Sequence, residues 1–150
     1  MGNAAAGESI VIPVADIGLL GRRVLQATDW TQDRPDLQHL PIGYFGASTG
    51  AAALIAAAAR PQAVCAVVSR GGRPDLADEA LPQVKAPTLL IVGGDDAPVI
   101  GMNRDAMSRM RAVVALEIVA GATHLFEEAG ALERVMDLAS GWFRRHLRVV

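Results

Sequence analysis

A serine stands between two glycines in the motif GASTG, at positions 46–50. The apolar segment 42–45 comes before it, and an alanine-rich stretch at 51–59 comes after it. A serine with these neighbours can occupy a sharp turn from strand to helix that presents its hydroxyl group, with the free N–H groups of the helix behind it. Such N–H groups stabilise the oxyanion of acyl transfer. The motif therefore predicts Ser48 as a nucleophile, with the backbone N–H of Thr49 as an oxyanion donor.

Two other glycine motifs are excluded by the residues around Ser48. A phosphate-binding loop needs four residues between its glycines, followed by a lysine, and no lysine lies near Gly50. The dinucleotide-binding fingerprint is also absent. Because short motifs of small residues are common in soluble proteins, the interpretation of GASTG depends on the other reactive side chains and on where they fall in the fold.

An acid and a histidine follow two later apolar segments. Asp95 and Asp96 come after the segment 88–92, and His124 comes after the segment 115–119. The order serine, aspartate, histidine is that of the α/β-hydrolase triad, in which histidine is the general base and aspartate orients its ring. Either aspartate could instead cap a helix or face solvent, and His124 could be a structural loop residue. Only one carboxylate can orient the imidazole, and we favour Asp96 over Asp95.

Apolar and amphipathic segments alternate along the chain. Short apolar runs predict strands at 42–45, 63–68, 88–92 and 115–119, and helical periodicity predicts helices at about 17–30, 49–59, 103–112 and 130–147. Asp16 is the expected N-cap of the first helix, and 10–14 is a possible further strand. The alternation predicts a three-layer α/β/α fold with a mostly parallel sheet of about four to five strands. The carboxyl ends of such strands meet at one edge, where ligands bind.

The composition excludes several classes of partner. At 150 residues we expect one domain, with a variable segment at 1–15 and a core at 16–150. A net charge of −2 without a basic cluster argues against a nucleic-acid partner, and no apolar run is long enough to span a membrane. Because the N-terminus has no basic region followed by an apolar signal core, we expect a cytoplasmic protein.

The other histidines and the cysteine carry no predicted chemistry. Cys65 lies in an apolar run and is expected to be a small buried hydrophobe. His39 lies in a polar loop, and His146 lies near a basic helix end, where its charge would favour the helix dipole. Three scattered histidines and one cysteine predict no metal site, and we expect no cofactor.

Four segments together resemble one known family: GYFGASTGAAA, VSRGGRPDL, APTLLIVGGDDAPVI and GATHLFEEAGALE. They are similar to the C-terminal part of dienelactone-hydrolase-like α/β hydrolases, in particular the branch often fused to a phosphoribosyltransferase domain. The resemblance covers about residue 16 to the end. It implies Ser48 as nucleophile, His124 as general base and Asp96 as the acid, three residues after the first glycine of a G-x-x-D turn. It implies a serine hydrolase that cleaves small esters or lactones through an acyl-enzyme intermediate. Some members use cysteine as nucleophile, so serine here favours general ester hydrolysis.

Arg70 and Arg73 follow the segment 63–68 and should reach the same edge of the sheet as the triad. They could bind a carboxylate or phosphate group of a substrate, or they could pair with Asp75 or Asp78 on the surface.

The resemblance also implies strands before residue 16 that this chain lacks, and with them the loop that donates the second oxyanion N–H. We therefore expect a truncated α/β-hydrolase fold, and loss of one such donor typically slows catalysis about a hundred- to a thousandfold. An unpaired apolar edge strand predicts a homodimer or higher homo-oligomer, formed through the sheet edge or by pairing of residues 10–14 with another chain. The alternative to an esterase is a weakly active or inactive module that serves in oligomerisation or protein interaction.

Overall fold

A computed structural model describes residues 16–147 of the chain. The described strands are β1 (Ile42–Ala47), β2 (Val64–Arg70), β3 (Thr88–Gly93) and β4 (Val114–Val119). The described helices are α1 (Ile17–Gln32), α2 (Gly50–Ala59), the 3-10 segment η2 (Pro74–Gln83), α3 (Ala97–Arg109) and α4 (Ala131–His146). Strands and helices alternate from β1 onward, as the sequence predicts.

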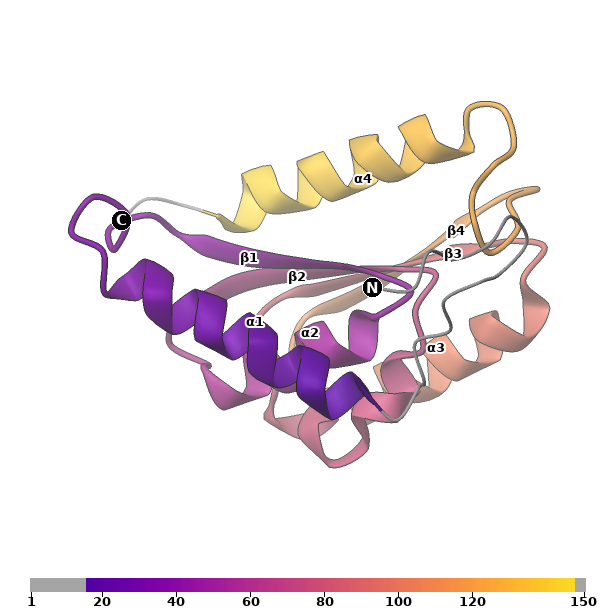
Figure 1. Ribbon diagram of the computed structural model, residues 1–150. Coiled ribbons are helices and arrows are strands. Elements are labelled where there is room, and N and C mark those ends of the chain that lie inside the picture. The colour runs from indigo at the N-terminus through magenta and orange to yellow at the C-terminus, as the bar shows by residue number, and fades with distance from the viewer. Residues whose placement is uncertain (1–15, 148–150) are drawn as a thin grey trace, which may run out of the picture.

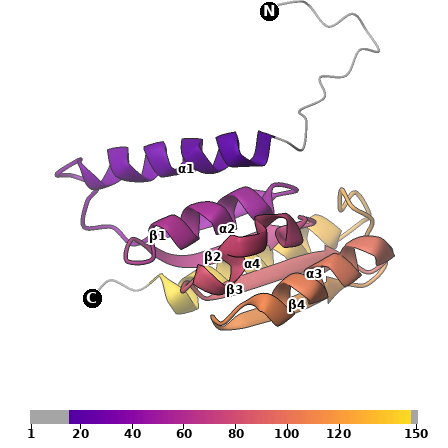
Figure 2. The same cartoon turned by 90° about the horizontal axis from the view of Figure 1, so that it is seen from below.

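The described strands form one parallel sheet in the order β1-β2-β3-β4 (Figure 1). The helices α1, α2 and α3 lie below the sheet in that view, and α4 lies above it. Figure 2 shows α1 beside α2, and α3 under the β3–β4 side. Parallel strands added in one direction through right-handed crossovers place their connections on one face, which is the arrangement of α2, η2 and α3. The predicted α/β/α fold with a parallel sheet is confirmed.

Two apolar clusters hold the layers together, one on each face of the sheet. On the first face Leu54 of α2 and Leu81 of η2 pack with Val67 of β2. On the second face Trp142 of α4 packs with Ile91 of β3 and with Phe126 of the preceding loop. Burying side chains of this size contributes about 1.5–3 kcal/mol each. The helices on both faces are therefore firmly packed against the sheet that carries the candidate site.

Several expected elements differ from the structure. The helix predicted at 103–112 begins earlier, at Ala97, because Pro98 is tolerated in the first turn of a helix, where its missing N–H has no partner to lose. The segment η2 was not expected, since it consists of short 3-10 turns interrupted at Asp78, where φ is +44°. Asp16 precedes α1, but its side chain makes no capping hydrogen bond to the described residues. The possible strand at 10–14 lies outside the described residues, and the division at residue 15 stays a prediction.

Candidate active site

Ser48 lies on a tight turn between β1 and α2. Its φ is +61°, a left-handed conformation that is uncommon for a residue with a side chain, and its N–H donates to the carbonyl oxygen of Arg70 at 2.9 Å. The flanking glycines make the turn possible. A Cβ on Gly46 would lie 3.0 Å from Cα of Gly50, and one on Gly50 would lie 1.9 Å from Oγ of Ser69. The small residues of GASTG are therefore a steric requirement of this turn.

The side chains of Ser48, His124 and Asp96 form a continuous chain of hydrogen bonds. Ser48 Oγ lies 3.1 Å from His124 Nε2, and His124 Nδ1 lies 3.1 Å from Asp96 Oδ2. With the proton on Nδ1, the ring donates to the carboxylate and its Nε2 accepts from the serine hydroxyl. Asp96 is largely buried, with 16% of its side chain exposed, and His124 is 45% exposed. The arrangement can pass a proton from Ser48 to a ring oriented by a carboxylate.

Three strand ends supply these groups. Ser48 follows β1, Asp96 follows β3, and His124 follows β4 at the same edge of the sheet. Asp95 is exposed, and its backbone N–H donates to the carbonyl oxygen of Ala122 at 3.0 Å. Of the two aspartates that the sequence left open, the structure places Asp96 against the imidazole.

The loop that carries His124 is held by contacts that sequence reasoning missed. Gly93 packs so closely that a Cβ there would lie 2.3 Å from the carbonyl oxygen of Ala122. Glu128 accepts hydrogen bonds from both the backbone N–H and the hydroxyl of Thr123, at 3.0 and 2.5 Å. The hydrogen bond from the Thr123 side chain lowers the pKa of Glu128. In the sequence, only the presence of Gly93, and of Glu127 and Glu128 after His124, could have pointed to these two contacts.

Thr49 is the N-cap residue of α2. Its hydroxyl donates to the carbonyl oxygen of Ala47 at 3.3 Å, and none of the described backbone hydrogen bonds outside helices and strands uses its N–H. This N–H is directly next to Ser48 and at the positive end of the α2 dipole. It is therefore placed to act as an oxyanion donor.

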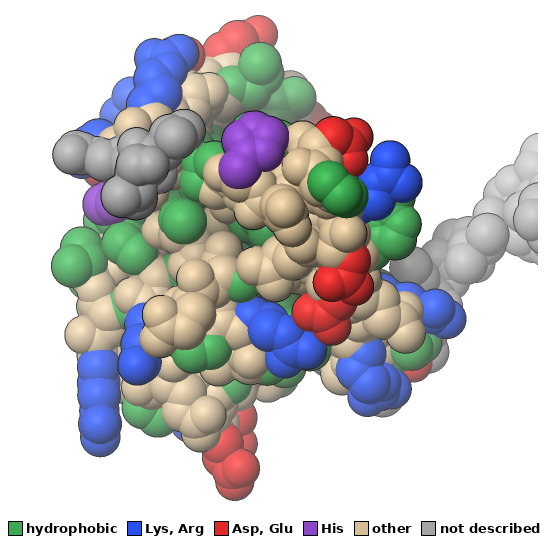
Figure 3. Space-filling model, turned by 90° about the vertical axis from the view of Figure 1, so that its left-hand side faces the viewer, with side chains coloured by type: hydrophobic (Ala, Val, Ile, Leu, Met, Phe, Trp, Pro, Cys, Tyr) green, Lys and Arg blue, Asp and Glu red, His purple; other side chains and the backbone are tan. Residues whose placement is uncertain are grey.

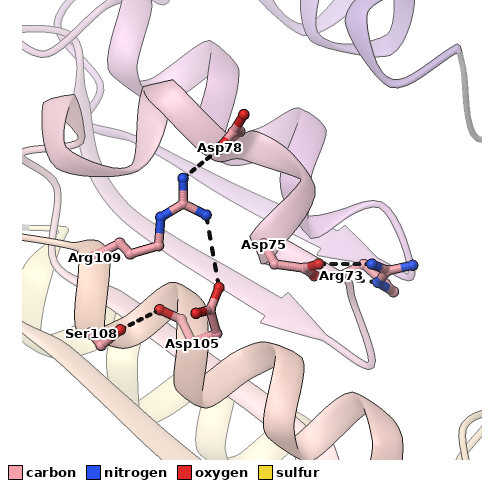
Figure 4. Close-up of polar contacts among 6 residues, drawn as sticks. All are labelled: Arg73, Asp75, Asp78, Asp105, Ser108 and Arg109. Atoms are coloured by element: carbon pink, nitrogen blue, oxygen red, sulfur yellow. Dashed lines mark hydrogen bonds and ion pairs between the residues drawn. The ribbon is translucent and has the colours of Figure 1, made fainter.

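Arg70 and Arg73 have different surroundings. The guanidinium of Arg70 lies 5.3 Å from the centre of the Phe126 ring, and its buried Nε has no hydrogen-bond partner among the described residues. Arg73 binds both carboxylate oxygens of Asp75, at 2.7 and 3.3 Å (Figure 4). This hydrogen bonding raises the pKa of Arg73. The structure thus pairs one arginine and leaves the other facing a cavity.

That cavity has a volume of about 320 Å³ and lies between β1 and α4. Apart from Arg70 and Ser140, its walls are apolar; they are formed by Phe45, Ala47, Leu132, Val135, Met136, Ala139 and Phe143. Ser48 is not among the lining residues, but Ala47, the residue directly before it, forms one end of the cavity. The apolar walls and the single cation suit a small organic group with an anionic substituent.

The remaining candidate residues lie outside the triad. His39 is exposed in the loop before β1, the ring of His146 contacts that of Trp142, and Cys65 is half-buried in β2 rather than fully buried. Within residues 16–147, no group of three His, Cys, Asp or Glu side chains is placed to share a metal ion. No helix in this part of the chain has the length and apolar character needed to cross a bilayer.

Basic and acidic side chains are interspersed over the face of the molecule seen in Figure 3, at the end of the sheet opposite the loop of His124. Four groups of arginine and aspartate side chains form ion pairs in the described residues, and one of them joins Arg109 of α3 to Asp78 and Asp105 (Figure 4). Such mixing gives this face no dominant sign of charge.

A model of the dienelactone hydrolase family matches residues 14–141. The chain belongs to the dienelactone hydrolase family. A crystal structure of a dienelactone hydrolase from Anabaena variabilis ATCC 29413 is 60% identical and superposes with a TM-score of 0.87 over 89% of this chain and 62% of that one. The resemblance stated from the sequence is therefore confirmed, and the fold of this dienelactone hydrolase family member is that of the α/β hydrolases.

Two further relatives extend the comparison. The protein named "Putative phosphoribosyl transferase Rv0571c", from Mycobacterium tuberculosis (strain ATCC 25618 / H37Rv), is 55% identical over 135 residues, which are 89% of this chain and 30% of that protein. A monoacylglycerol lipase from Paleococcus ferrophilus is 15% identical with a TM-score of 0.65, over 81% of this chain and 74% of that one, and shows the shared fold alone. The chain spans about a third of the curated relative, whose name agrees with the predicted phosphoribosyltransferase branch.

Proposed function

We propose that this member of the dienelactone hydrolase family is a serine hydrolase that cleaves small carboxylic esters or lactones. The observation that carries the proposal is the hydrogen-bonded chain Ser48–His124–Asp96, with both distances at 3.1 Å. Geometry of this kind activates a serine hydroxyl that is otherwise a weak nucleophile. The solved relative named as a dienelactone hydrolase supports the same reaction class.

In the proposed reaction, Oγ of Ser48 attacks the ester carbonyl carbon while Nε2 of His124 takes its proton. The tetrahedral oxyanion faces the N–H of Thr49 and collapses with loss of the alcohol, which receives the proton from His124. Water then attacks the acyl-enzyme, with His124 again as base, and releases the acid and the free serine. Asp96 holds the ring in the tautomer that this cycle needs and stabilises its charged form.

The cavity beside Ser48 supports a preference for substrates with an acidic group. Its apolar walls would hold a short hydrocarbon portion, and Arg70 would pair with a carboxylate or phosphate. Arg73 is a weaker candidate because Asp75 already occupies its guanidinium. Arg70→Ala should lower kcat/KM for a monoester of a dicarboxylic acid more than for a neutral ester of equal length, whereas Arg73→Ala should affect both substrates alike. An equal effect of Arg70→Ala on the two esters would contradict the assignment.

The first test is hydrolysis of a short-chain p-nitrophenyl ester. Ser48→Ala should reduce the rate to that of the uncatalysed background. Cys65→Ala removes the one thiol of the chain and controls for thiol reactivity, so it should retain the wild-type rate. Equal rates in the wild type and both variants would reject the serine-hydrolase proposal.

We also propose that the chain assembles as a homodimer or higher homo-oligomer through the edge of β1. No described strand pairs with β1 on the side away from β2. Beside that edge Phe45, Leu132 and Met136 are 49%, 50% and 62% exposed. An unpaired edge flanked by apolar side chains favours association. Light scattering at micromolar concentration should give at least twice the monomer mass, and a monomer would count against the proposal.

The same edge supports a second candidate function, a module with little or no catalysis that serves in protein interaction. This alternative predicts assembly together with ester hydrolysis at the background rate. The esterase proposal predicts hydrolysis that depends on Ser48. Measuring both properties on one preparation separates the two functions.

A further inference from the structure

The loop between β4 and α4 holds His124 in an irregular segment, residues 120–130. Three of its residues have positive φ, namely Gly121, Phe126 and Gly130, at 75°, 56° and 80°. Phe126 carries a side chain in this conformation, which is sparsely populated unless the surroundings hold it. Phe126 is 2% exposed and belongs to the apolar cluster that packs against α4. The loop is thus anchored to the core two residues after His124.

A second anchor acts directly before His124. Oε1 of Glu128 accepts the backbone N–H of Thr123 at 3.0 Å and its hydroxyl at 2.5 Å. The carbonyl oxygen of Thr123 accepts the N–H of Phe126 at 3.1 Å. Both polar groups of the Thr123 backbone and its side chain are therefore engaged by residues on the far side of His124. The carboxylate of Glu128 closes the loop around the histidine.

We propose that Glu128 is a positioning residue, whose carboxylate holds Thr123 so that the ring of His124 stays in line between Ser48 and Asp96. This inference rests on the proposed function and deepens it. Removing the carboxylate leaves two donors of Thr123 without their acceptor, so the backbone before His124 can rotate. A shift of about 1 Å at a reacting group can cost about a hundredfold in rate.

The loop keeps its other attachments when the carboxylate is removed. Ala122 and Phe126 stay buried, and the end of β3 still packs against the Ala122 carbonyl oxygen. The variant is therefore expected to fold, with its defect confined to the orientation of His124. A side-chain amide at position 128 keeps a carbonyl oxygen that can accept both donors of Thr123, so glutamine should rescue what alanine loses.

The test compares Glu128→Ala and Glu128→Gln with Glu127→Ala, a matched control because the neighbouring Glu127 is exposed and has no described contact. Glu128→Ala should lower kcat for a p-nitrophenyl ester by about 10- to 100-fold with KM changed less than about twofold. Glu128→Gln should recover most of kcat, and Glu127→Ala should match the wild type. Full kcat in Glu128→Ala, or no rescue by glutamine, would overturn the proposal.

A spectroscopic readout keeps this inference separate from the proposed function. The proton on Nδ1 of His124, donated to Asp96, can be followed by NMR in the folded chain, and amide exchange of Thr123 can be followed in the same samples. Glu128→Ala should lose the Nδ1 proton signal and speed exchange at Thr123, while Glu128→Gln and Glu127→Ala should retain both. If the wild type hydrolyses no ester but these shifts occur, the hydrolase proposal fails and the positioning role stands. If neither readout responds to Glu128→Ala, the positioning role fails.

Discussion

Replacing Gly93 with alanine should disturb the triad without touching any of its members. A Cβ on Gly93 would lie 2.3 Å from the carbonyl oxygen of Ala122 and 2.8 Å from that of Thr123. Ordinary contact begins at 3.4 Å and both obstacles are backbone atoms, so the strand end and the loop must separate by about 1 Å. Asp96 lies just after that strand end, and His124 directly follows the two obstructing residues Ala122 and Thr123. The separation therefore acts on the 3.1 Å hydrogen bond between them.

The expected cost of Gly93→Ala has two parts. Overpacking of this kind destabilises a fold by about 1–3 kcal/mol, which chemical denaturation can measure. A displacement of about 1 Å between catalytic groups should lower kcat about a hundredfold in the ester assay. Gly101→Ala is the matched control, since a Cβ there meets no atom within 4 Å. Within the helix α3 that change should stabilise the protein by about 0.5–1 kcal/mol.

The outcome that refutes this reasoning is a Gly93→Ala protein as stable as Gly101→Ala. The loop that carries His124 would then move away from β3 without loss of stability. The contact between this loop and Gly93 could not be what fixes the position of the loop. A destabilised protein with full activity would refute the second part alone. In that case strand and loop separate without lengthening the hydrogen bond from His124 to Asp96.

Two further predictions concern stability. The Thr28 hydroxyl donates its single proton to the carbonyl oxygen of Val24 at 2.8 Å, so the buried hydroxyl of Tyr44 is the donor in the 2.5 Å contact between Tyr44 and Thr28. Tyr44→Phe should lower the free energy of unfolding, measured by urea denaturation, by about 1 kcal/mol. The hydrogen bonds from Thr123 lower the pKa of Glu128 below its ordinary value of 4.5. The carboxylate of Glu128 therefore stabilises the folded chain above pH 4.5. This contribution is lost as the pH falls through the lowered pKa of the folded state. The stability difference between wild type and Glu128→Gln should therefore shrink below about pH 4.5 in acid denaturation, and a difference independent of pH would contradict it.

The sequence predicts which strand ends carry the reactive groups, because alternating strands and helices are compatible with few sheet topologies. Short apolar runs between helical segments form a parallel sheet, and the carboxyl ends of its strands meet at one edge. The sequence alone therefore predicts that Ser48, Asp96 and His124 lie close together. The same reasoning located four strands to within one or two residues. The sequence could not show the partners of Arg70 and Arg73, because the pairing depends on the unexpected turn that brings Asp75 beside Arg73.

The contacts missed from the sequence are those made by backbone conformation. Phe126 has a positive φ in the segment between Thr123 and Glu128, which are joined by a hydrogen bond, and no periodic sequence pattern predicts such a turn. The start of α3 differs from the prediction because apolar periodicity is weak over its first turn, which contains Pro98 and follows the N-cap Asp96. Local rules therefore predict which residues reach the site, whereas the loop geometry decides how well they are aligned.

The proton transfer proposed for Ser48, His124 and Asp96 uses only side chains at the ends of the described strands. Ser48, Asp96 and His124 follow β1, β3 and β4, and none of them depends on a strand beyond the edge of β1. Whatever covers that edge can therefore act on oxyanion stabilisation, substrate binding and assembly, but it is not needed to pair the base with the nucleophile. Absence of a second oxyanion donor would then lower turnover by about a hundred- to a thousandfold while leaving the hydrogen-bonded triad intact. We expect hydrolysis that disappears in Ser48→Ala, and faster hydrolysis in an assembled state would indicate that the partner covering β1 supplies a second oxyanion donor.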